Sequence, residues 1–446
     1  MKSPRALLDC RRSFIAALFG CRALAWQVFC FLALWTTQAH AGNYEGILVG
    51  SDAVLTGGAV TATVGDGTAA WYNPAGIARV DKQSFDVNAS VYGIGIFTAD
   101  PFATVAGGTS QEAGTTDWQL IPSVLSYARE LSPTMVAAFS IIIPRTTDYD
   151  FRASAQTPDG GRWSLGIDTL GNEYDYILSL GFRLGHDLRL GFSVDGIYFS
   201  TENVIQVARG QPDADGTPFA SFSSHTKLGD YGLRLGAGLQ WTPSSRLNLG
   251  LSLQTPTLTG YRSTFSTTTN AAMRAGSPSQ FDLVEKDEMT PVWELSTPLS
   301  VRFGAAYKVG RTQLLLDGSI YSPLDSSVRA LDRKLTGNVR LGCLVALSEL
   351  LSFGVGAFTD LNGFKHGAAV DFAGLAGGAR LAKRYRLAEG GRTVEVTTTL
   401  AGRYAYGWGK ANGVDFQGGD PSAYTLTTVP MTAHELAFNL AGGVSF

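Results

Sequence analysis

Five arginines stand in segments where apolar and polar residues alternate: Arg183, Arg234, Arg302, Arg340 and Arg403. An arginine guanidinium can bind a carboxylate through two parallel hydrogen bonds. These residues therefore predict a site for a ligand with an acidic group. We take Arg302, Arg340 and Arg234 as candidate ligand-binding residues.

Acidic residues in the same alternating segments offer these arginines a second role. They are Asp175, Asp195 and Glu395. An arginine that faces the inside of a protein commonly pairs with a carboxylate of the chain itself. At the level of sequence, both a ligand contact and an internal ion pair stay open.

Catalysis and metal binding have little support in the sequence. After residue 41 the histidines are His186, His225, His366 and His434, each in or near an expected turn or loop, and there is no Gly-x-Ser-x-Gly motif and no metal-ligand spacing. Cys343 is the single cysteine in this part, which excludes a disulfide framework. We expect no enzyme, no catalytic residue, no metal and no cofactor.

The composition fits neither an ordinary soluble chain nor a helical membrane protein. Of 446 residues, 16% are charged and 53 are glycine. Soluble chains carry about a quarter charged residues, and helical membrane proteins show several apolar runs of about 20 residues. A different kind of membrane protein therefore has to be considered.

Residues 1–41 have the pattern of a secretory signal. A basic start (Lys2, Arg5) precedes the apolar run "ALAWQVFCFLALW" (23–35), and "AHA" (39–41) supplies a cleavage site after Ala41. A lipoprotein cleavage site at "LFGC" (18–21) is the alternative, but it would leave the apolar run on the mature chain. Cleavage removes five of 35 basic and one of 38 acidic residues, leaving 30 and 37, a net charge of −7. Nucleic acid is therefore not an expected partner.

From residue 85 onward the chain shows a period of two. In "YDYILSLGFRL" (174–184), tyrosine, leucine and phenylalanine alternate with aspartate, serine, glycine and arginine, which predicts a strand with one apolar face. Similar segments give fourteen strands, near residues 85, 118, 135, 174, 188, 229, 247, 299, 312, 337, 351, 370, 392 and 434.

The connections between these strands alternate in length. Short turns of two to five residues alternate with longer loops, of which the longest is expected at 258–298. An even number of strands with this rhythm is typical of a bacterial transmembrane β-barrel. Aromatic residues toward the strand ends on the apolar face suit membrane interfaces: Tyr174, Tyr198, Tyr231, Trp241, Tyr307, Tyr404 and Tyr406. Phe446 suits a terminal strand that is read by the outer-membrane barrel assembly machinery.

Two other folds compete with the barrel. Residues 341–358 could form one membrane helix, but Glu349 would then lie near mid-bilayer at a cost of about 2.5 kcal/mol or more. A secreted protein of two packed sheets would show the same alternation, because alternation does not say whether the apolar face meets lipid or protein.

The segment before the first strand has a rigid corner. Asn73 can cap a short helix that begins at Pro74, where the missing amide hydrogen costs nothing. A fourteen-stranded barrel is too wide for its own side chains to fill. We therefore expect residues 42–82 to fold into a plug inside the lumen.

The stretch "GSDAVLTGGAVTATVGDGTAAWYNPAGIARV" (50–80), with Asn73, Pro74 and Ala75, resembles the N-terminal hatch of the outer-membrane long-chain fatty acid and aromatic hydrocarbon transporters of the FadL/TodX type. "IPSVLSYARELSPTM", "STPLSVRFGAAYKV" and the terminal phenylalanine are similar too. The resemblance implies a signal peptide (1–41), a hatch (42–82) and a fourteen-stranded transmembrane β-barrel (83–446) in the bacterial outer membrane.

The resemblance also implies a function. In that family, a hydrophobic ligand enters among the extracellular loops, reaches a pocket in the barrel and leaves sideways into the bilayer when the hatch shifts. Passive transport of long-chain fatty acids or aromatic hydrocarbons is thus expected, by a monomer whose partners are the ligand, outer-membrane lipid and the barrel assembly machinery. A weakly selective porin and an outer-membrane lipase are the alternatives.

Apolar residues in the longest expected loop form a second candidate site. They are Met273, Phe281, Leu283, Met289 and Trp293. They could capture a hydrophobic ligand, and they could equally hold the loop together. Of these we take Phe281, Leu283 and Trp293 as candidate ligand-binding residues.

Overall fold

A computed structural model describes residues 47–105, 111–156, 162–210, 219–273, 280–325, 332–365, 369–386, 393–416 and 424–445. The expected signal peptide and Phe446 lie outside these residues. The chain beyond Ala41 forms one compact unit, and the description below concerns that unit.

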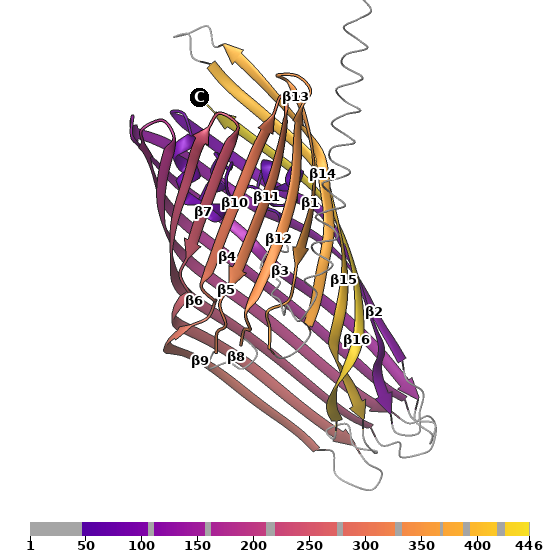
Figure 1. Cartoon of the computed structure of the whole chain (residues 1–446). Coiled ribbons are helices and arrows are strands. Elements are labelled where there is room, and N and C mark those ends of the chain that lie inside the picture. Colours follow the sequence, from indigo (N-terminus) through magenta and orange to yellow (C-terminus); the bar gives the residue numbers. More distant parts are fainter. Residues whose placement is uncertain are drawn as a thin grey trace, which may run out of the picture. The chain divides into compact units, whose positions relative to one another are not determined.

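Antiparallel strands dominate the structure (Figure 1). The strand segments are β1 (Gln83–Val105), β2 (Gln111–Ser132), β3 (Met135–Gln156), β4 (Arg162–Leu184), β5 (Leu188–Gly210), β6 (Phe219–Ser244), β7 (Leu247–Gln254), β8 (Leu258–Met273), β9 (Gln280–Leu295), β10 (Ser300–Val309), β11 (Thr312–Tyr321), β12 (Thr336–Ala346), β13 (Leu351–Asp360), β14 (Ala369–Arg386), β15 (Thr393–Phe416) and β16 (Tyr424–Ser445).

The sheet closes on itself. Neighbours in sequence pair around the wall, β1 pairs with β16, and β5 pairs with β6 to complete the ring. β7 pairs with one end of β6 and β8 pairs with the other end, so β7 and β8 together form one strand of the wall. In the same way, β10 pairs with β7 and β9 pairs with β8, and β9 and β10 together form the next strand. Two of the sixteen segments are thus continuations of others, and the wall has fourteen strands. This confirms the predicted antiparallel β-barrel and excludes the secreted two-sheet alternative.

The expected forty-residue loop at 258–298 is wrong. Its described residues form the β8–β9 hairpin, with Leu258 paired with Leu295 and Ala272 with Gln280. The prediction failed because this stretch is rich in threonine and charge on both faces, so it lacks the apolar alternation of the other strands. Pro256 lies in the interruption between β7 and β8, and Pro298 lies in the interruption between β9 and β10; proline cannot donate a hydrogen bond to a ladder.

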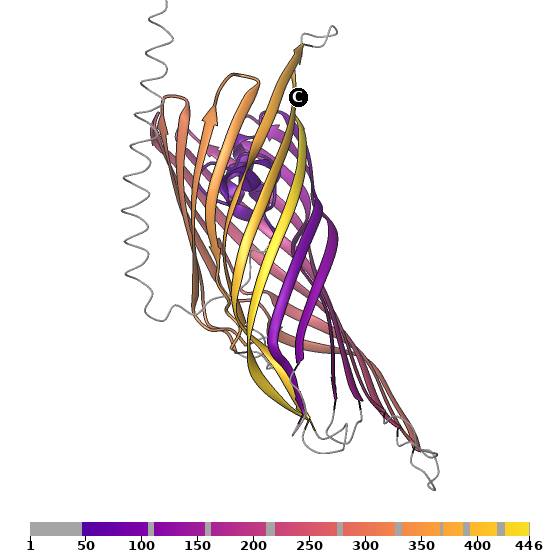
Figure 2. The same ribbon diagram turned by 90° about the vertical axis from the view of Figure 1, so that its right-hand side faces the viewer.

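Several strands are longer than a membrane requires. β4 and β5 have 23 residues each and β6 has 26, whereas about 9–11 tilted residues cross a bilayer. The extra length lies at the end away from the short turns, and Figure 2 shows strands continuing there. Segments that the sequence indicated as long loops are thus partly extensions of the sheet.

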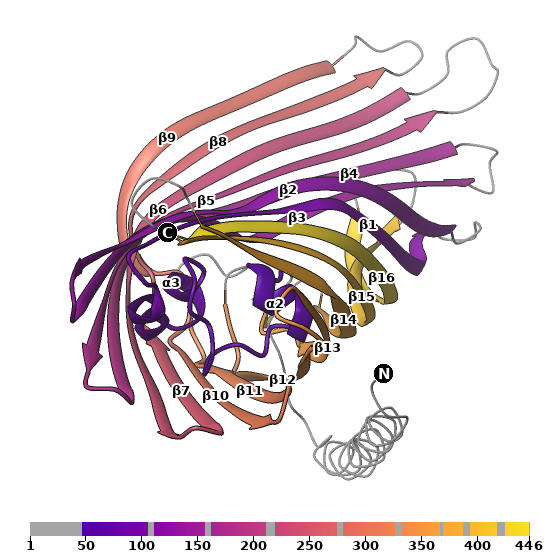
Figure 3. The same ribbon diagram turned by 90° about the horizontal axis from the view of Figure 1, so that it is seen from above.

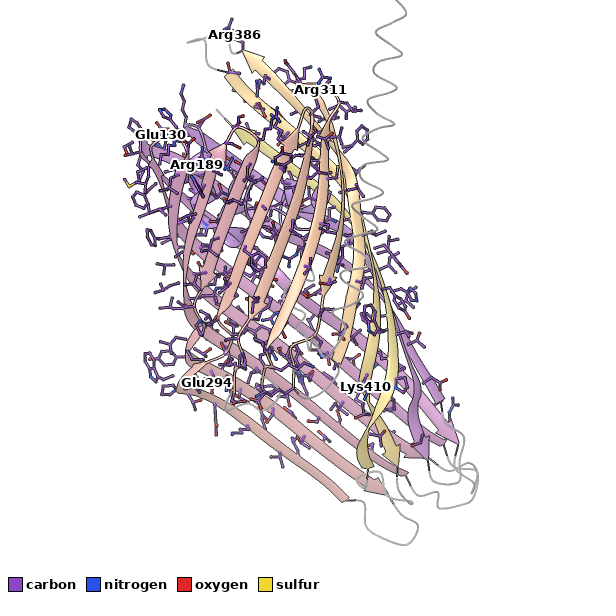
Figure 4. All side chains as sticks on the ribbon, viewed as in Figure 1. Glu130, Arg189, Glu294, Arg311, Arg386 and Lys410 are labelled. Atoms are coloured by element: carbon purple, nitrogen blue, oxygen red, sulfur yellow. The ribbon has the colours of Figure 1, made fainter. Side chains whose placement is uncertain are left out.

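The alternation of side chains gives the wall an apolar outer face. In β4, Leu178 is 61% exposed while its neighbour Ser179 is buried. Figure 4 shows charged residues at the ends of the barrel, among them Glu130, Arg189, Arg311 and Arg386 at the short-turn end. The exposed apolar band between the ends is the surface that a transmembrane barrel presents to lipid.

The segment 341–358 is two strands and not a helix. β12 ends at Ala346, β13 begins at Leu351, and Glu349 is exposed in the turn between them. Among the described residues, no helix is long and apolar enough to cross a membrane.

Residues 47–82, here called the N-terminal segment, fold inside the ring, as the view in Figure 3 shows. The segment contains the helices α2 (Ser51–Thr56) and α3 (Ala69–Tyr72) and the 3₁₀-helix η1 (Pro74–Arg79). α2 ends at Gly57, whose φ of 64° is readily adopted by glycine. The segment provides much of the buried apolar core, including Val49, Leu55 and Ile77.

Candidate functional site

The Asn73-Pro74-Ala75 corner holds the N-terminal segment to itself and to the wall. Asn73 Oδ1 accepts a hydrogen bond from the Ala75 amide (3.2 Å), and Pro74 opens η1, so the predicted cap is confirmed. The Nδ2 group of Asn73 donates to the carbonyl of Thr61 (2.9 Å) and to that of Leu239 in β6 (3.0 Å). One side chain thus joins two parts of the segment to the barrel.

Glycines on the inner face of the wall make room for this corner. A Cβ on Gly191 would lie 2.1 Å from the carbonyl carbon of Pro74, and one on Gly238 would lie 2.1 Å from Asn73 Oδ1. Both distances are far below van der Waals contact, so backbone of the segment lies directly against backbone of the wall. Glycines on the polar face of the strands are visible in the sequence, but their close contact with the N-terminal segment appears only in the structure.

Two polar side chains of the wall bind the backbone of the segment. Asp317 in β11 accepts hydrogen bonds from the amides of Val60 (2.9 Å) and Thr61 (2.7 Å). Gln240 in β6 donates to the carbonyl of Val64 (3.0 Å). These bonds satisfy backbone groups that would otherwise be buried without partners. Asp317 and Gln240 were missed in the sequence analysis, where a lone inward polar residue gave no signal.

Trp71 of α3 lies between two of the predicted arginines. The guanidinium carbons of Arg234 and Arg302 are each 5.0 Å from the centre of the Trp71 ring, and Arg302 Nη1 donates to the Trp71 carbonyl (2.8 Å). Cation–π contacts of this kind contribute about 0.5–2 kcal/mol each. In this structure Arg234 and Arg302 therefore hold the N-terminal segment, and a ligand contact by either is untested.

Arg234 also forms the centre of a buried ion-pair network. It binds Asp195 through Nε (3.0 Å) and Asp175 through Nη2, and Glu173 lies 3.9 Å from its Nη1. Arg145 in β3 binds the other oxygen of Glu173. The internal pairing that the sequence left open is thus present at Arg234.

Arg340 belongs to β12 in the barrel wall. Its side chain is buried, and a Cβ on Gly58 would lie 2.8 Å from its Cδ. It therefore packs against the turn after α2, and the structure does not bring it together with Arg234 and Arg302 around Trp71. The other inward arginines are paired too, Arg183 with Glu130 and Arg403 with Glu435.

The residues of the second candidate site lie on one strand. Phe281, Leu283 and Trp293 all belong to β9 instead of a loop. Leu283 and Trp293 are 56% and 66% exposed, so they contribute to neither an apolar core nor an enclosed surface. The side chain of Phe281 lies outside the described set. A capture role for these residues remains a prediction.

Two adjoining cavities lie in the lumen, and the smaller one is lined by Trp71 of the N-terminal segment. The larger, of about 430 Å³, is bounded by β4, β5 and β6 and by the two proline-containing interruptions, and it includes Ile197, Phe199, Leu228 and Phe364. The smaller, of about 30 Å³, is bounded by Trp71, Pro144, Arg234 and Arg302, among others. Both are lined by Arg145, Glu173 and Thr297, so the two cavities adjoin at these residues.

The barrel wall has an incomplete ladder beside the small cavity. β2 and β3 pair from Ser132–Met135 up to Val124–Ile142. Beyond that point, in the described residues, β2 pairs with β1 and β3 pairs with β4, but not with each other. Pro122 and Pro144 lie at the place where the ladder stops, and Pro144 lines the small cavity.

Two acidic groups in the N-terminal segment have raised pKa values. Burial, together with the charges of Asp86 and Asp52, raises the pKa of Asp66 to about 7, although Thr68 donates two hydrogen bonds to its carboxylate. Burial also raises the pKa of Tyr72 to about 12. Asp66 is thus the group of the segment that titrates near neutral pH.

Together these features define a transmembrane barrel whose lumen contains its own N-terminal segment. No family model matches the chain. No curated protein matches it either.

Solved structures share this architecture. A FadL homologue of Pseudomonas aeruginosa matches 92% of this chain and 100% of its own with a TM-score of 0.56 at 13% identity. The toluene transporter TodX of P. putida matches 90% and 99% with a TM-score of 0.57 at 12% identity. The Ralstonia pickettii toluene transporter TbuX matches 91% and 99% with a TM-score of 0.53 at 12% identity. The chain thus has the fold of the FadL/TodX-type barrels, as the sequence resemblance predicted.

Proposed function

We propose that this protein is a passive outer-membrane transporter of hydrophobic compounds. One observation carries the proposal: an internal cavity of about 430 Å³ adjoins a second cavity at the point where the β2–β3 ladder stops. Ligand cavities commonly measure about 300–1,000 Å³. The similar structures include two toluene transporters, which supports the same class of substrate.

A side exit suits an apolar solute. Transfer of apolar surface from water to lipid is favourable by roughly 25 cal/mol per Å². A compound that leaves between β2 and β3 would enter the bilayer directly and avoid the aqueous periplasm. The proline residues at this point support such an exit, because they remove backbone donors that would otherwise join the two strands.

In this account, residues 42–82 are a hatch that must shift before the compound can leave, and residues 1–41 are a signal peptide cleaved after Ala41. The contacts of Asn73, Asp317 and Trp71 support a segment that is held inside the lumen. A general porin would instead need an open lumen.

The test compares uptake of a labelled long-chain alcohol, a long-chain acid and a short sugar, in cells that carry the protein and in cells that lack it. We expect protein-dependent uptake of at least one long-chain compound and exclusion of the sugar. Equal passage of the sugar would identify a general porin and reject the proposal. Deleting residues 48–80 should raise ion conductance in planar bilayers, since the barrel would lose its plug.

A further inference from the structure

Carboxyl groups outnumber guanidiniums around the large cavity. Four charged residues line it: Arg145, Glu173, Asp230 and Arg333. Glu173 belongs to the network that contains Arg145, Arg234, Asp175 and Asp195. In that network two guanidiniums face three carboxyl groups, so both guanidiniums already have partners in the chain.

A second buried cluster on the same cavity has the same imbalance. Arg262 in β8 binds Asp230 in β6 with both Nε (2.7 Å) and Nη2 (2.8 Å), and Nη2 also contacts Glu294 in β9. One guanidinium thus serves two carboxylates. A negative cluster therefore lies beside the cavity.

Arg333 supplies the remaining positive charge. It lies before β12, and its guanidinium carbon is 3.2 Å from the centre of the Phe364 ring. The Lys334 amide donates to the Gly363 carbonyl (2.8 Å), which joins the segment before β12 to the segment after β13. With Arg333 included, four guanidiniums and five carboxylates surround the cavity, so Arg333 does not reverse the balance.

An anionic ligand would bind here at a disadvantage. To contact Arg145 it would have to displace Glu173, and to contact Arg262 it would have to displace Asp230 or Glu294. Removing one partner of a buried ion pair leaves an uncompensated charge, which is strongly unfavourable. The ligand's own carboxylate would also have to give up its hydration on entering.

Short hydroxyl side chains suit a neutral polar group instead. At the two interruptions of the wall, the hydroxyls of Thr257 and Thr297 lie 2.7 Å apart, and Thr259 donates to Ser296 (2.8 Å). All four residues line the cavity. A hydroxyl carries one donor and two acceptor sites, so a bonded pair keeps capacity to donate to or accept from a ligand.

The size of the cavity exceeds that needed for one aromatic ring. A cavity of about 150 Å³ holds benzene, and this one is about 430 Å³. Ile197, Phe199 and Leu228 supply apolar surface on β5 and β6. A larger apolar body with one polar group therefore fits both its volume and its lining.

We propose that the large cavity binds neutral hydrophobic molecules that carry a hydroxyl or carbonyl group, and that it discriminates against carboxylates of the same length. This inference rests on the proposed transport function and specifies its substrate class. It selects a neutral oxygenated compound over the fatty acid that the sequence resemblance suggests. Thr257 and Thr297 are its specificity-determining residues.

The test uses photoreactive probes of equal chain length: a long-chain alcohol, the corresponding acid and the methyl ester of that acid, each with a diazirine in the middle of the chain. The full-length protein is reconstituted in lipid nanodiscs at pH 8, and labelled peptides are mapped by mass spectrometry. We expect the alcohol and the ester to label β5 and β6 near Phe199 and Leu228 about tenfold more than the acid, a ratio equivalent to about 1.4 kcal/mol.

Variants separate the two parts of the inference. Thr257→Val combined with Thr297→Val should reduce labelling by the alcohol severalfold, whereas Thr398→Val, in a groove on the outside of the wall, should not. Glu173→Gln should increase labelling by the acid, because it removes one carboxylate from the network. Each variant is used only after heat-modifiable migration shows a folded barrel, and the comparison of the three probes needs no variant.

Equal or preferential labelling of the cavity by the acid would overturn the inference and leave transport of hydrophobic compounds intact. If none of the three probes labels the cavity, the inference is also wrong. The proposed function fails on a different result, namely passage of a sugar through the intact protein.

Discussion

Asn73 and Leu239 are joined by a hydrogen bond of 3.0 Å from the Asn73 side-chain amide to the Leu239 carbonyl. Asn73 belongs to the N-terminal segment and Leu239 to β6, in the barrel wall. The same Asn73 amide reaches Thr61 within the segment. The side chain of Asn73 therefore supports both the fold of the segment and its attachment to the wall.

Replacing Asn73 by alanine should loosen the segment. The change removes the cap on η1 and the bond to the Leu239 carbonyl, while the Thr61 carbonyl keeps a bond from Gln240 (3.3 Å). Leaving one buried carbonyl without its donor costs about 1–3 kcal/mol. We expect more frequent open events in single-channel recordings. Asn248→Ala is the matched control, because Asn248 bonds to Thr242 in the wall. Indistinguishable recordings for the two variants would argue against a holding role for Asn73.

The N-terminal segment can lie this close to the wall because residue 191 is glycine. An added Cβ would lie 2.1 Å from the Pro74 carbonyl carbon, so Gly191→Ala must displace the segment or strain the wall, at about 1–3 kcal/mol. We expect faster cleavage of the segment by added protease while the barrel stays heat-modifiable. Gly402→Ala, whose Cβ would meet only Phe438 at 4.0 Å, should be cleaved like the unchanged protein. If the two variants are cleaved at the same rate, the close fit at Gly191 is not required.

Much of the barrel is predictable from the sequence because one physical rule governs it. In β4 and β5, one face meets lipid and the other faces the polar interior, which forces a period of two. Both strands appear where that period predicts them. The β8–β9 hairpin was missed because beyond the membrane both faces tolerate polar residues, so Thr264 and Thr267 carry no alternation signal.

The site was less predictable than the wall. Asn73 could be recognised as a cap from its neighbour Pro74 alone, since capping is local. The partners of Arg234 come from β4 and β5, and Asp317 binds residues more than 250 positions away. Such pairings depend on which strands are neighbours and how they are staggered, which alternation does not specify.

The attachment of the segment should weaken as the pH rises from about 4 to 7. The pKa of Asp66 is about 7 in the seated segment against an ordinary value of 3.8. Between these values the seated state binds more protons than a segment exposed to water, so its stability falls with rising pH. Below about 4 both states are protonated and above about 7 both are ionised, so the change is confined to this window and amounts to at most roughly 4 kcal/mol.

Hydrogen exchange of residues 60–80 at pH 5 and pH 8 checks this expectation, after correction for the intrinsic exchange rate. We expect greater protection at pH 5. Asp66→Asn should keep the bonds from Thr68 and remove most of the pH dependence, because the amide does not titrate. Persistence of the full pH dependence in this variant would assign it to another group.

If the N-terminal segment must move for a hydrophobic compound to pass, a reversible covalent lock between the segment and the wall should block uptake. A Cβ on Gly342 would lie 3.4 Å from that of Ala59, close to the separation of about 3.5–4.5 Å found in disulfides, and 2.8 Å from that of Thr56, so the single variant Gly342→Cys is the control for this close approach. The measurement is uptake of a labelled long-chain alcohol by Ala59→Cys plus Gly342→Cys, with Cys343→Ser to remove the competing thiol, before and after reduction. We expect the oxidised protein, with the crosslink verified by mass spectrometry, to take up little or none of the alcohol, and reduction to restore uptake, while each single-cysteine variant transports under both conditions. Equal uptake by the oxidised and reduced protein would contradict the need for this movement.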